Sequence, residues 1–423
     1  MTDDTPRDFL AALFRRAVRA ADPRDTIAAH LPDPPRGRTV VIGAGKAASR
    51  MAAALESVWP APLDGVVIDR YGPITPTKKI KVLQASHPVP DVAGLAGAKA
   101  LLAAVGGLTA DDLVIALISG GGSALLPMPG GSLTLANEIA VNEALLRSGA
   151  PIAAMNVVRK HVSGIKGGRL AQAAAPARVV SLLVSDVAGD NPALVASGPT
   201  VPSATTPADA LAIIDDYRMK LPEAVIAHLR SPAAIAPMPD DPAFAQNRAV
   251  VVASARTSLY AAADFARSRG VTPVVLSDAI EGGSQSVGSM HAAIAREVAR
   301  FDQPFSKPVV LLSGGETTVA LGDGPVGRGG PNTEFLLSVA RGIAGLSGVH
   351  ALAADTDGID GSEDNAGAFA DGQSFARMRM AGIDPQKALH THDAWTAFAA
   401  IDDLLVTGPT GTNVNDFRAI LIR

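Results

Sequence analysis

Short runs of β-branched and other apolar residues alternate along this chain with alanine-rich stretches of helical period. The pattern predicts strands at 39–43, 65–69, 81–85, 112–118, 178–185, 249–253, 272–276, 308–313, 350–354 and 403–407, with helices between most of them. Runs such as "LVIALIS" and "VVSLLVS" are apolar throughout, which is typical of parallel strands covered on both faces. The pattern therefore indicates an α/β chain with largely parallel sheets.

The length of the chain and one proline-rich stretch indicate two domains. At 423 residues the chain exceeds what one hydrophobic core usually organises. Residues 231–247, "SPAAIAPMPDDPAFAQN", contain four prolines and no clear period, which is typical of a linker. We therefore expect an N-terminal domain over 1–238 and a C-terminal domain over 239–423. Residues 402–423 have two apolar runs around a Gly/Pro/Asn turn and predict a hairpin that adds an antiparallel pair to the second sheet.

Composition and charge exclude several functional classes. The net charge is −4 and no run of five like charges occurs, so the chain lacks the electrostatic footprint of a nucleic-acid or anionic-membrane binder. The absence of cysteine excludes disulfides, zinc–thiolate sites, iron–sulfur clusters and cysteine nucleophiles. The first 25 residues lack the continuous apolar core of a signal peptide, and no apolar run approaches the ~18 residues that span a bilayer. We expect a soluble, cytoplasmic protein.

Two glycine-rich turns fall within "LLSGGETTVALGDGPVGRGGPNTE", residues 311–334. The first follows an apolar strand and consists of Ser313, Gly314, Gly315 and Glu316; the second carries Arg328 to a helix that Asn332 can cap. Glycines let backbone N–H groups approach an anion closely, a helix N-terminus adds partial positive charge, and an arginine fork matches phosphate oxygens. The stretch predicts phosphate binding, although glycine turns also occur for conformational reasons alone.

A third glycine turn lies in "TVVIGAGKAASRMAAAL", residues 39–55. The predicted strand runs into Gly43, Ala44 and Gly45 and then into an alanine-rich helix, which is the arrangement that places an anion at a helix N-terminus. Lys46 follows the turn directly and would meet such an anion. Asp69 ends the next predicted strand at the distance expected of a ribose-binding acid, so a dinucleotide site is an alternative.

The segment "LVIALISGGGSALLP" repeats the same design. A buried strand ends in Ser119, Gly120, Gly121, Gly122 and Ser123, a sequence able to form a nest of N–H groups for a carboxylate or a phosphate.

A histidine and a basic segment allow two interpretations each. His87, in the proline-rich loop "ASHPVPD", is either structural or functional. The segment 156–170, "NVVRKHVSGIKGGRL", is either a solvated basic helix face or a cationic wall for an anionic ligand, and Lys166 is its candidate ligand-binding residue.

Acidic residues follow two predicted strands. Asp186 and Asp190 come after the strand 178–185, where strand-end carboxylates commonly hold a hydrated metal or position a substrate hydroxyl. The acidic run "AADTDGIDGSEDNAGA" departs from the EF-hand loop, because no glutamate stands at the twelfth position and no helix precedes it. We therefore expect a cation beside phosphates rather than a calcium cage.

Nine ordered motifs together resemble one protein family. These are "GAGKAA", "HPVPD", "SGGGSALL", "NVVRKHVSGIKGGRLA", "SDVAGDNPALVASGPT", "SGGETTV", "GRGGPNTE", "DTDGIDG" and "TGPTGTNVND". The set is similar to that of class II glycerate 2-kinases, whose C-terminal half is called the MOFRL domain, and the resemblance covers nearly the whole chain.

The resemblance implies a two-domain α/β enzyme with a Rossmann-like N-terminal domain and a MOFRL-type C-terminal domain that contains a mixed sheet. It implies transfer of the γ-phosphoryl group of ATP to the 2-hydroxyl of D-glycerate, and it marks Lys46 and Arg328 as catalytic. Because the phosphates of ATP need a divalent ion to neutralise developing charge, we expect Mg²⁺ as cofactor. The oligomeric state is not fixed by the sequence, and a homodimer is compatible with it.

Two other functions remain open at this point. Many relatives are called hydroxypyruvate reductases, and an NAD(P)H-dependent reductase would explain the turn at Lys46 and Asp69. It would leave the glycine turns of the C-terminal half without a role. A non-catalytic regulator that binds a sugar phosphate would use the glycine turns but would leave the clustered aspartates unexplained. Phosphoryl transfer, which requires positioning and positive charge, uses all of these features.

Overall fold

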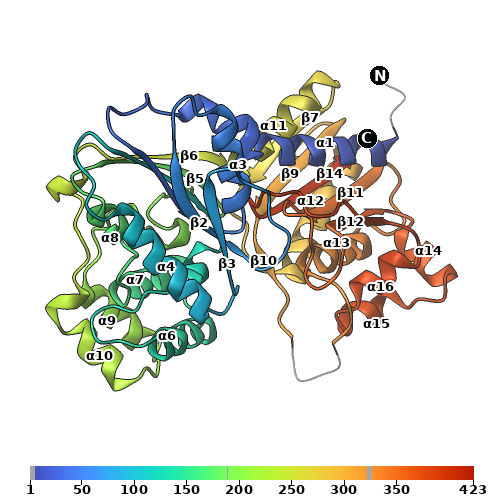
Figure 1. Ribbon diagram of the computed structural model, residues 1–423. Helices are drawn as coiled ribbons and strands as arrows, with labels where there is room; N and C mark the ends of the chain where they lie inside the picture. The colour runs from blue at the N-terminus through green and yellow to red at the C-terminus, as the bar shows by residue number, and fades with distance from the viewer. Residues whose placement is uncertain (1–4, 188, 322–325) are drawn as a thin grey trace. The chain divides into compact units, whose positions relative to one another are not determined.

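A computed structural model describes residues 5–187, 189–321 and 326–423, which divide into two compact units (Figure 1). The central unit is Pro23–Val252. The flanking unit joins Met1–Asp22 to Ala253–Arg423. Each unit contains a six-stranded sheet. Among the described residues, no helix combines the length and the apolar character needed to cross a membrane.

The sheet of the central unit has the strand order β3-β2-β1-β4-β5-β6. The pairs β1–β2, β2–β3, β1–β4 and β4–β5 are parallel. The strands are β1 (Thr39–Ala44), β2 (Asp64–Arg70), β3 (Ile80–Ala85), β4 (Leu113–Ser119), β5 (Arg178–Ser185) and β6 (Arg248–Ser254). All residues of β1 and β4 are buried, which explains their continuously apolar sequences. This order is that of a Rossmann-like doubly wound sheet.

The helices of the central unit form two groups. The first group includes α4, which packs on β2 and β3, and it consists of α2 (Pro23–Thr26), α3 (Ala48–Val58), α4 (Val92–Val105), α5 (Gly122–Leu125) and α8 (Arg169–Ala173). The second group has its own small apolar core and appears together in Figure 1; it consists of α6 (Leu135–Ser148), α7 (Ile152–His161), α9 (Pro207–Asp216) and α10 (Glu223–Leu229). Capping boxes at Thr134 and Thr206 fix the starts of α6 and α9.

The sheet of the flanking unit is mixed and has the order β13-β12-β11-β14-β9-β7. Only β7 and β9 pair in parallel, and the other neighbours are antiparallel. The strands are β7 (Thr272–Ser277), β9 (Val309–Gly315), β11 (Val349–Asp355), β12 (Gly367–Asp371), β13 (Leu404–Leu405) and β14 (Asp416–Ile422). A separate short pair joins β8 (Gly282–Gly283) to β10 (Thr317–Thr318).

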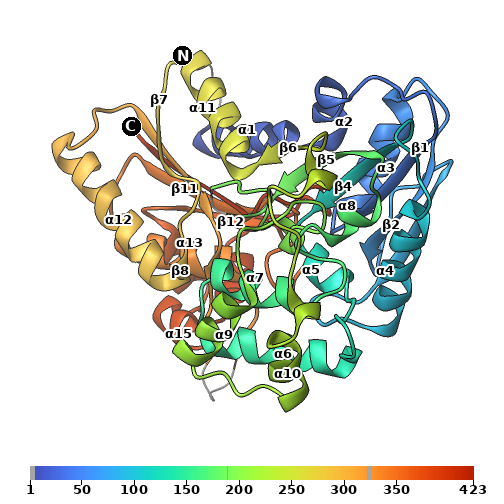
Figure 2. The ribbon, with the colours of Figure 1, turned by 90° about the vertical axis from the view of Figure 1, so that its left-hand side faces the viewer.

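Helices cover both faces of this second sheet. Val310 and Leu312 of β9 belong to the core formed with α1 (Pro6–Ala20) and α11 (Ala255–Ser268), whereas Val309 and Leu311 belong to the core formed with α12 (Ser284–Phe301) and α13 (Pro331–Gly342). Figure 2 shows α1 beside α11. The short helices α14 (Ser374–Met380), α15 (Pro385–His390) and α16 (Ala394–Ala399) complete the second core.

The structure confirms the α/β class and the mixed second sheet, and each predicted strand has a counterpart. The hairpin predicted over 402–423 is wrong. β13 pairs with β12, whereas β14 lies between β11 and β9 and is antiparallel to both. All residues of β14 are buried, as expected of a strand that has a seven-residue neighbour on each side.

The units also divide at positions that differ from the expected boundary at 238/239. The stretch 231–247 lies within the central unit, because β6 follows it and still pairs with β5. The N-terminal helix α1 belongs to the flanking unit, where Phe14 packs edge-on against Phe417 and the hydroxyl of Ser258 donates to the carbonyl of Ala17.

Candidate active site

The central sheet reverses its winding between β1 and β4, which are adjacent although β1 is followed in the chain by β2. Ligands of open α/β sheets bind outside the carboxyl ends of the strands at such a switch point. The turn after β1 carries Lys46, and the turn after β4 carries Gly120 to Gly122. Two of the four predicted glycine turns therefore meet where this fold is expected to bind ligands.

The turn after β1 has already used its backbone donors. The N–H of Gly45 donates to the carbonyl of Ile68 at 3.1 Å and the N–H of Lys46 to the carbonyl of Gly120 at 2.9 Å. The N–H of Ala47 donates to Oγ of Ser119 at 3.1 Å. These bonds tie the turn to β2 and β4, so the phosphate-binding role predicted for Gly43 and Gly45 would not come from a free nest.

Asp69 is also engaged within the protein. Its buried carboxylate accepts the N–H of Ser49 at 2.9 Å, in the first turn of α3, and the N–H of Arg70 at 2.8 Å. Burial raises the pKa of this carboxyl, and the bonds from Ser49 oppose that shift. A ribose hydroxyl would have to displace a helix-start interaction to reach Asp69, which disfavours the dinucleotide interpretation.

The turn after β4 gathers three polar side chains. A Cβ on Gly121, which has φ +80°, would lie 3.0 Å from Nε2 of His87 and 3.1 Å from Cγ of Lys46. A Cβ on Gly120 would lie 2.0 Å from Oδ2 of Asp186. Only glycine permits so close an approach of a lysine stem, an imidazole and a carboxylate to one backbone turn. α5 starts here, and the N–H groups of Ala124 and Leu125 both donate to the carbonyl of Gly121, so an anion at this turn would have to bind the N–H groups that precede them.

The charges in this cluster influence one another. Burial lowers the pKa of His87 to about 4, and the charges of Lys46 and Arg70 act in the same direction, so the imidazole is neutral at pH 7. Burial raises the pKa of Asp186, and Lys46 opposes that shift. The sequence left the role of His87 open; the structure places it beside Lys46.

A hydrogen-bonded chain extends the site from α5. The hydroxyls of Ser123 and Ser197 are 2.7 Å apart, and the hydroxyl of Ser197 donates to Oδ1 of Asn156 at 2.8 Å. Ser197 is fully buried and has φ +60°, a left-handed conformation that is costly for a non-glycine residue. Neither Ser197 nor Asn156 is among the site residues predicted above, although both lie in motifs of the family set, "SDVAGDNPALVASGPT" and "NVVRKHVSGIKGGRLA".

Lys166, predicted to bind phosphate, is held in the interior. Its ammonium donates to Oε1 of Glu138 at 2.7 Å and to the carbonyl of Leu126 at 2.8 Å, and both side chains are almost completely buried. Nearby basic residues are also engaged: Lys160 donates to Ser203, and Arg169 donates to three backbone carbonyls. The segment 156–170 is therefore neither a solvated basic face nor an open cationic wall.

The two predicted metal ligands occupy different environments. Asp186 lies against Gly120, as described above. Asp190 adopts φ +53° in the loop that follows, and its N–H donates to the carbonyl of Val187. In the part of the chain that the structure describes, no group of three or more His, Asp or Glu side chains is arranged to hold a metal ion. The assignment of both residues to a metal stays a prediction.

In the flanking unit, Arg328 precedes α13 and is half exposed. Residues 322–325 of the predicted glycine turn lie outside the described residues. The guanidinium carbon of Arg328 lies 3.5 Å from the ring centroid of Trp395, and the guanidinium donates to Glu363. This hydrogen bond raises the pKa of Arg328 and lowers that of Glu363. The N–H of Arg328 donates to Asp393 at 3.0 Å and its carbonyl accepts from Trp395 at 3.0 Å.

The start of α13 is occupied by a carboxylate of the protein. Asp360 accepts the N–H of Asn332 at 2.9 Å and the N–H of Thr333 at 2.8 Å. Asn332 is buried and donates its side-chain amide to Asp416 at 2.6 Å. Burial raises the pKa of Asp360 to about 6. The N–H groups of Asn332 and Thr333 are thus bonded to Asp360, and Asn332 is part of an internal network. The phosphate-binding role of Asn332 stays a prediction.

The turn after β9 is likewise built into the interior. Ser313 is hydrogen-bonded through Oγ to Nε2 of His291 at 3.0 Å. The carbonyl of Gly314 accepts from Ile280 and from the buried guanidinium of Arg418. Glu316 is exposed. Of the residues predicted here, only Glu316 presents its side chain to solvent, and the phosphate-binding role of Ser313, Gly314 and Gly315 stays a prediction.

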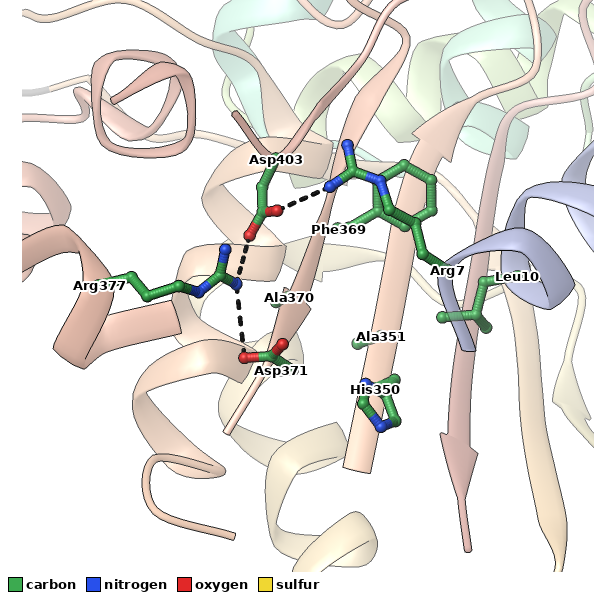
Figure 3. A pocket seen from close by; sticks show the side chains of 9 residues that line it. All are labelled: Arg7, Leu10, His350, Ala351, Phe369, Ala370, Asp371, Arg377 and Asp403. Atoms are coloured by element: carbon green, nitrogen blue, oxygen red, sulfur yellow. Dashed lines mark hydrogen bonds and ion pairs between the residues drawn. The ribbon is translucent and has the colours of Figure 1, made fainter. Parts of the chain in front are cut away.

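A cavity of about 180 Å³ lies at the other end of the flanking sheet (Figure 3). Asp403 lies between the guanidinium groups of Arg7 and Arg377, at 2.9 and 2.7 Å. His350, near the start of β11, and Asp371, at the end of β12, also line the cavity. Asp360 follows the opposite end of β11. The arginine charges of the cavity are compensated by aspartates, so the cavity serves to hold α1 rather than to attract an anion.

Comparisons with known proteins extend over the whole chain. The profile described as "Domain of unknown function (DUF4147)" matches residues 9–230, and the profile of the "MOFRL family" matches residues 309–416. A protein of Agrobacterium vitis named "Putative hydroxypyruvate reductase" is 51% identical over 99% of this chain and 95% of its own length. The "Glycerate 2-kinase" of Pyrococcus horikoshii is 38% identical over 98% of this chain and 97% of its own. The crystal structure of glycerate kinase from Thermotoga maritima superposes with a TM-score of 0.87, at 34% identity over 98% of this chain and 99% of that chain.

Proposed function

Since this chain belongs to the glycerate 2-kinase family that joins a DUF4147 domain to a MOFRL domain, we propose that it transfers the γ-phosphoryl group of ATP to the 2-hydroxyl of D-glycerate. The products are ADP and 2-phosphoglycerate. The observation that carries this function is the cluster of Lys46, His87 and Asp186 around the glycine turn at the switch point of the central sheet.

Phosphoryl transfer requires positioned cations and N–H donors around the transferred group, with little covalent participation of the protein. The bond from the γ-phosphorus to the bridging oxygen of ADP breaks as the hydroxyl oxygen attacks. Lys46 and the start of α5 stabilise the phosphate charge in the central unit, and Arg328 of the flanking unit supplies the second proposed catalytic cation. His87 is neutral at pH 7, so its ring can hydrogen-bond to bound groups beside Lys46, but a pKa of about 4 makes it too weak a base to be assigned the proton of the attacking hydroxyl.

The residues present fit a magnesium ion that is carried by the nucleotide. Mg²⁺ usually takes one or two carboxylates and completes its octahedron with phosphates and water. Asp186, beside the glycine turn, supplies one such carboxylate, and the described residues form no larger acidic cage. When bound, the ion would neutralise charge on the β- and γ-phosphates.

The name of the Agrobacterium relative keeps a reductase as the second candidate. Against it stand the internal bonds of Asp69 and of the N–H groups of Gly45 and Lys46, which a dinucleotide would need. One purified sample decides between the two. ADP release is followed with D-glycerate, ATP and Mg²⁺, with and without excess chelator, and NAD(P)H loss is followed with hydroxypyruvate.

We expect ADP release that depends on D-glycerate and is lost in chelator. NAD(P)H oxidation without ATP turnover would establish the reductase instead. If the protein binds phosphorylated acids but shows neither ATP turnover nor NAD(P)H oxidation, it is a non-catalytic regulator.

A further inference from the structure

The loop after β11 holds the turn that carries Arg328. Asp360 of this loop is 1% exposed, and its two carboxylate oxygens accept the N–H groups of Asn332 and Thr333. A Cβ on Gly330 would lie 2.4 Å from Oδ1 of Asp360, so the backbone of the turn lies directly on this carboxylate. Three residues further along the loop, Glu363 accepts from the guanidinium of Arg328.

The backbone of Arg328 is held by Asp393 and Trp395, and Asp360 fixes the part of the turn between Arg328 and the first residues of α13. Gly329 and Gly330 separate Arg328 from Pro331, and paired glycines permit a wide range of backbone conformations. Asp360 is itself fixed, because its N–H donates to the carbonyl of Asn365 at 2.7 Å. A buried network continues from Asn332 through Asp416 to Arg418, so the anchor is attached to β14 of the sheet.

Helix stability alone does not explain a carboxylate at this position. Neutral side chains such as serine or asparagine cap helices about as well as aspartate does, and they avoid the desolvation of a buried charge. What the carboxylate adds is two oxygens that fix two consecutive N–H groups, and with them the direction in which the turn leaves the helix.

We infer that Asp360 is a positioning residue for Arg328, acting through the start of α13 to keep the guanidinium stacked on Trp395 and directed for phosphoryl transfer. The inference rests on the proposed function for the catalytic role of Arg328. The stacking of Arg328 on Trp395 is measurable without any activity.

The test uses the full chain in a Trp59→Phe background, where Trp395 is the remaining tryptophan. Trp59 makes no hydrogen bond through its indole nitrogen to a described residue, so phenylalanine removes none there. The variants are Asp360→Asn, Arg328→Ala and both together. Asp384→Asn is the matched control, since Asp384 also accepts two backbone N–H groups at a helix start, that of α15.

Acrylamide quenching of Trp395 fluorescence and steady-state kinetics are measured for each variant. Asp360→Asn should increase quenching to the level of Arg328→Ala and lower kcat about tenfold or more, with KM for ATP changed less than about threefold. Asp384→Asn should change neither. In the double variant kcat should match that of Arg328→Ala within about twofold, because a residue that acts through Arg328 has no further effect once the guanidinium is absent.

Wild-type quenching and kcat in folded Asp360→Asn would overturn the inference, and so would a loss of kcat that multiplies with that of Arg328→Ala. If Asp360→Asn does not fold, Asp360→Ser, which retains a cap to one N–H, is judged by the same two measurements. If the wild-type protein shows no ATP turnover, the proposed function fails, and the quenching experiment alone then decides whether Asp360 holds Arg328 on Trp395.

Discussion

Gly120 and Asp186 are in such close proximity that a Cβ on the glycine would lie 2.0 Å from Oδ2 of the carboxylate. The two residues come from the ends of the neighbouring strands β4 and β5, where parallel pairing brings Ser119 opposite Val184. The carboxylate of Asp186 can therefore occupy this position only because residue 120 is glycine and has no side chain.

Gly120→Ala should displace Asp186 and lower kcat about tenfold or more, because misplacement of about 1 Å is sufficient for large losses. Gly106→Ala is the control, since Gly106 has an ordinary φ of −71° and its Cβ would find contacts no closer than 3.5 Å. Steady-state kinetics of both variants provide the measurement. Equal kcat values in the two variants would show that the position of Asp186 does not affect the reaction.

Lys46→Ala should reduce kcat by at least about a hundredfold with a smaller effect on ATP binding, because the ammonium stabilises charge that develops in the transition state. Lys99→Ala, on the exposed surface of α4, should leave both parameters unchanged. Nucleotide binding is measured separately by calorimetry. A folded Lys46→Ala enzyme with normal kcat would remove this lysine from the proposed site.

Arg328→Lys should also lower kcat by at least about a hundredfold, since an ammonium does not reproduce a planar fork that stacks on Trp395 and binds phosphate. Arg341→Lys offers a comparison at an exposed arginine that donates to the hydroxyl of Ser289. Parallel initial-rate measurements decide the matter, and similar rates for the two variants would contradict a catalytic Arg328.

Lys166→Met should lower the free energy of unfolding by about 3 kcal/mol or more, because it leaves Glu138 as a buried charge without its partner. Arg147→Met breaks an exposed pair with Glu143 and should cost less than about 1 kcal/mol. Urea unfolding followed by Trp59 fluorescence, in a Trp395→Phe background, reports on the central unit. An increase in KM for ATP without a decrease in the free energy of unfolding would instead support a ligand-binding role for Lys166.

Asp360 should make stability depend on pH. Its pKa is about 6 in the folded protein against an ordinary 3.8, so the folded state holds the proton more tightly than the unfolded state does. Its contribution is therefore fully present below about pH 4 and is lost as the pH rises through 6, by up to about 3 kcal/mol. The free energy of unfolding of the wild type and of Asp360→Asn is measured by Trp395 fluorescence from pH 4 to 7. The value for the wild type minus that for the variant should decrease as the pH rises through this range. A difference independent of pH would contradict the raised pKa.

Much of the fold could be predicted because its cause is local in the sequence. Strands such as β4 are buried on both faces, and this leaves an uninterrupted apolar run that can be recognised without knowing the neighbours. The choice of neighbours is not local. β14 follows β13 in the chain but pairs with β11 and β9, whose paired residues lie between 61 positions (Asp355 and Asp416) and 113 positions (Val309 and Ile422) earlier.

The candidate site shows the same limit. Glycine turns and Lys46 could be recognised from short motifs, whereas the burial of Lys166 depends on Glu138, 28 residues away. A helix start near Asn332 favours an anion, and a short motif is enough to predict this. The carboxylate that accepts the N–H of Asn332 belongs to Asp360, 28 residues later, and such a distant partner is not visible in the motif.

The division of the chain has a consequence for its synthesis. Helix α1 leaves the ribosome before the strands and the helix on which it packs, because β11, β14 and α11 follow only after the 230 residues of the central unit, Pro23–Val252. The central unit is complete by then and is able to fold during translation, since domains generally fold as units. The nascent α1 therefore has Phe9, Leu13 and Phe14 uncovered until α11 emerges, and Phe14 also lacks Phe417 until β14 follows. Chaperones that shield apolar nascent helices would be expected to act on this end of the chain.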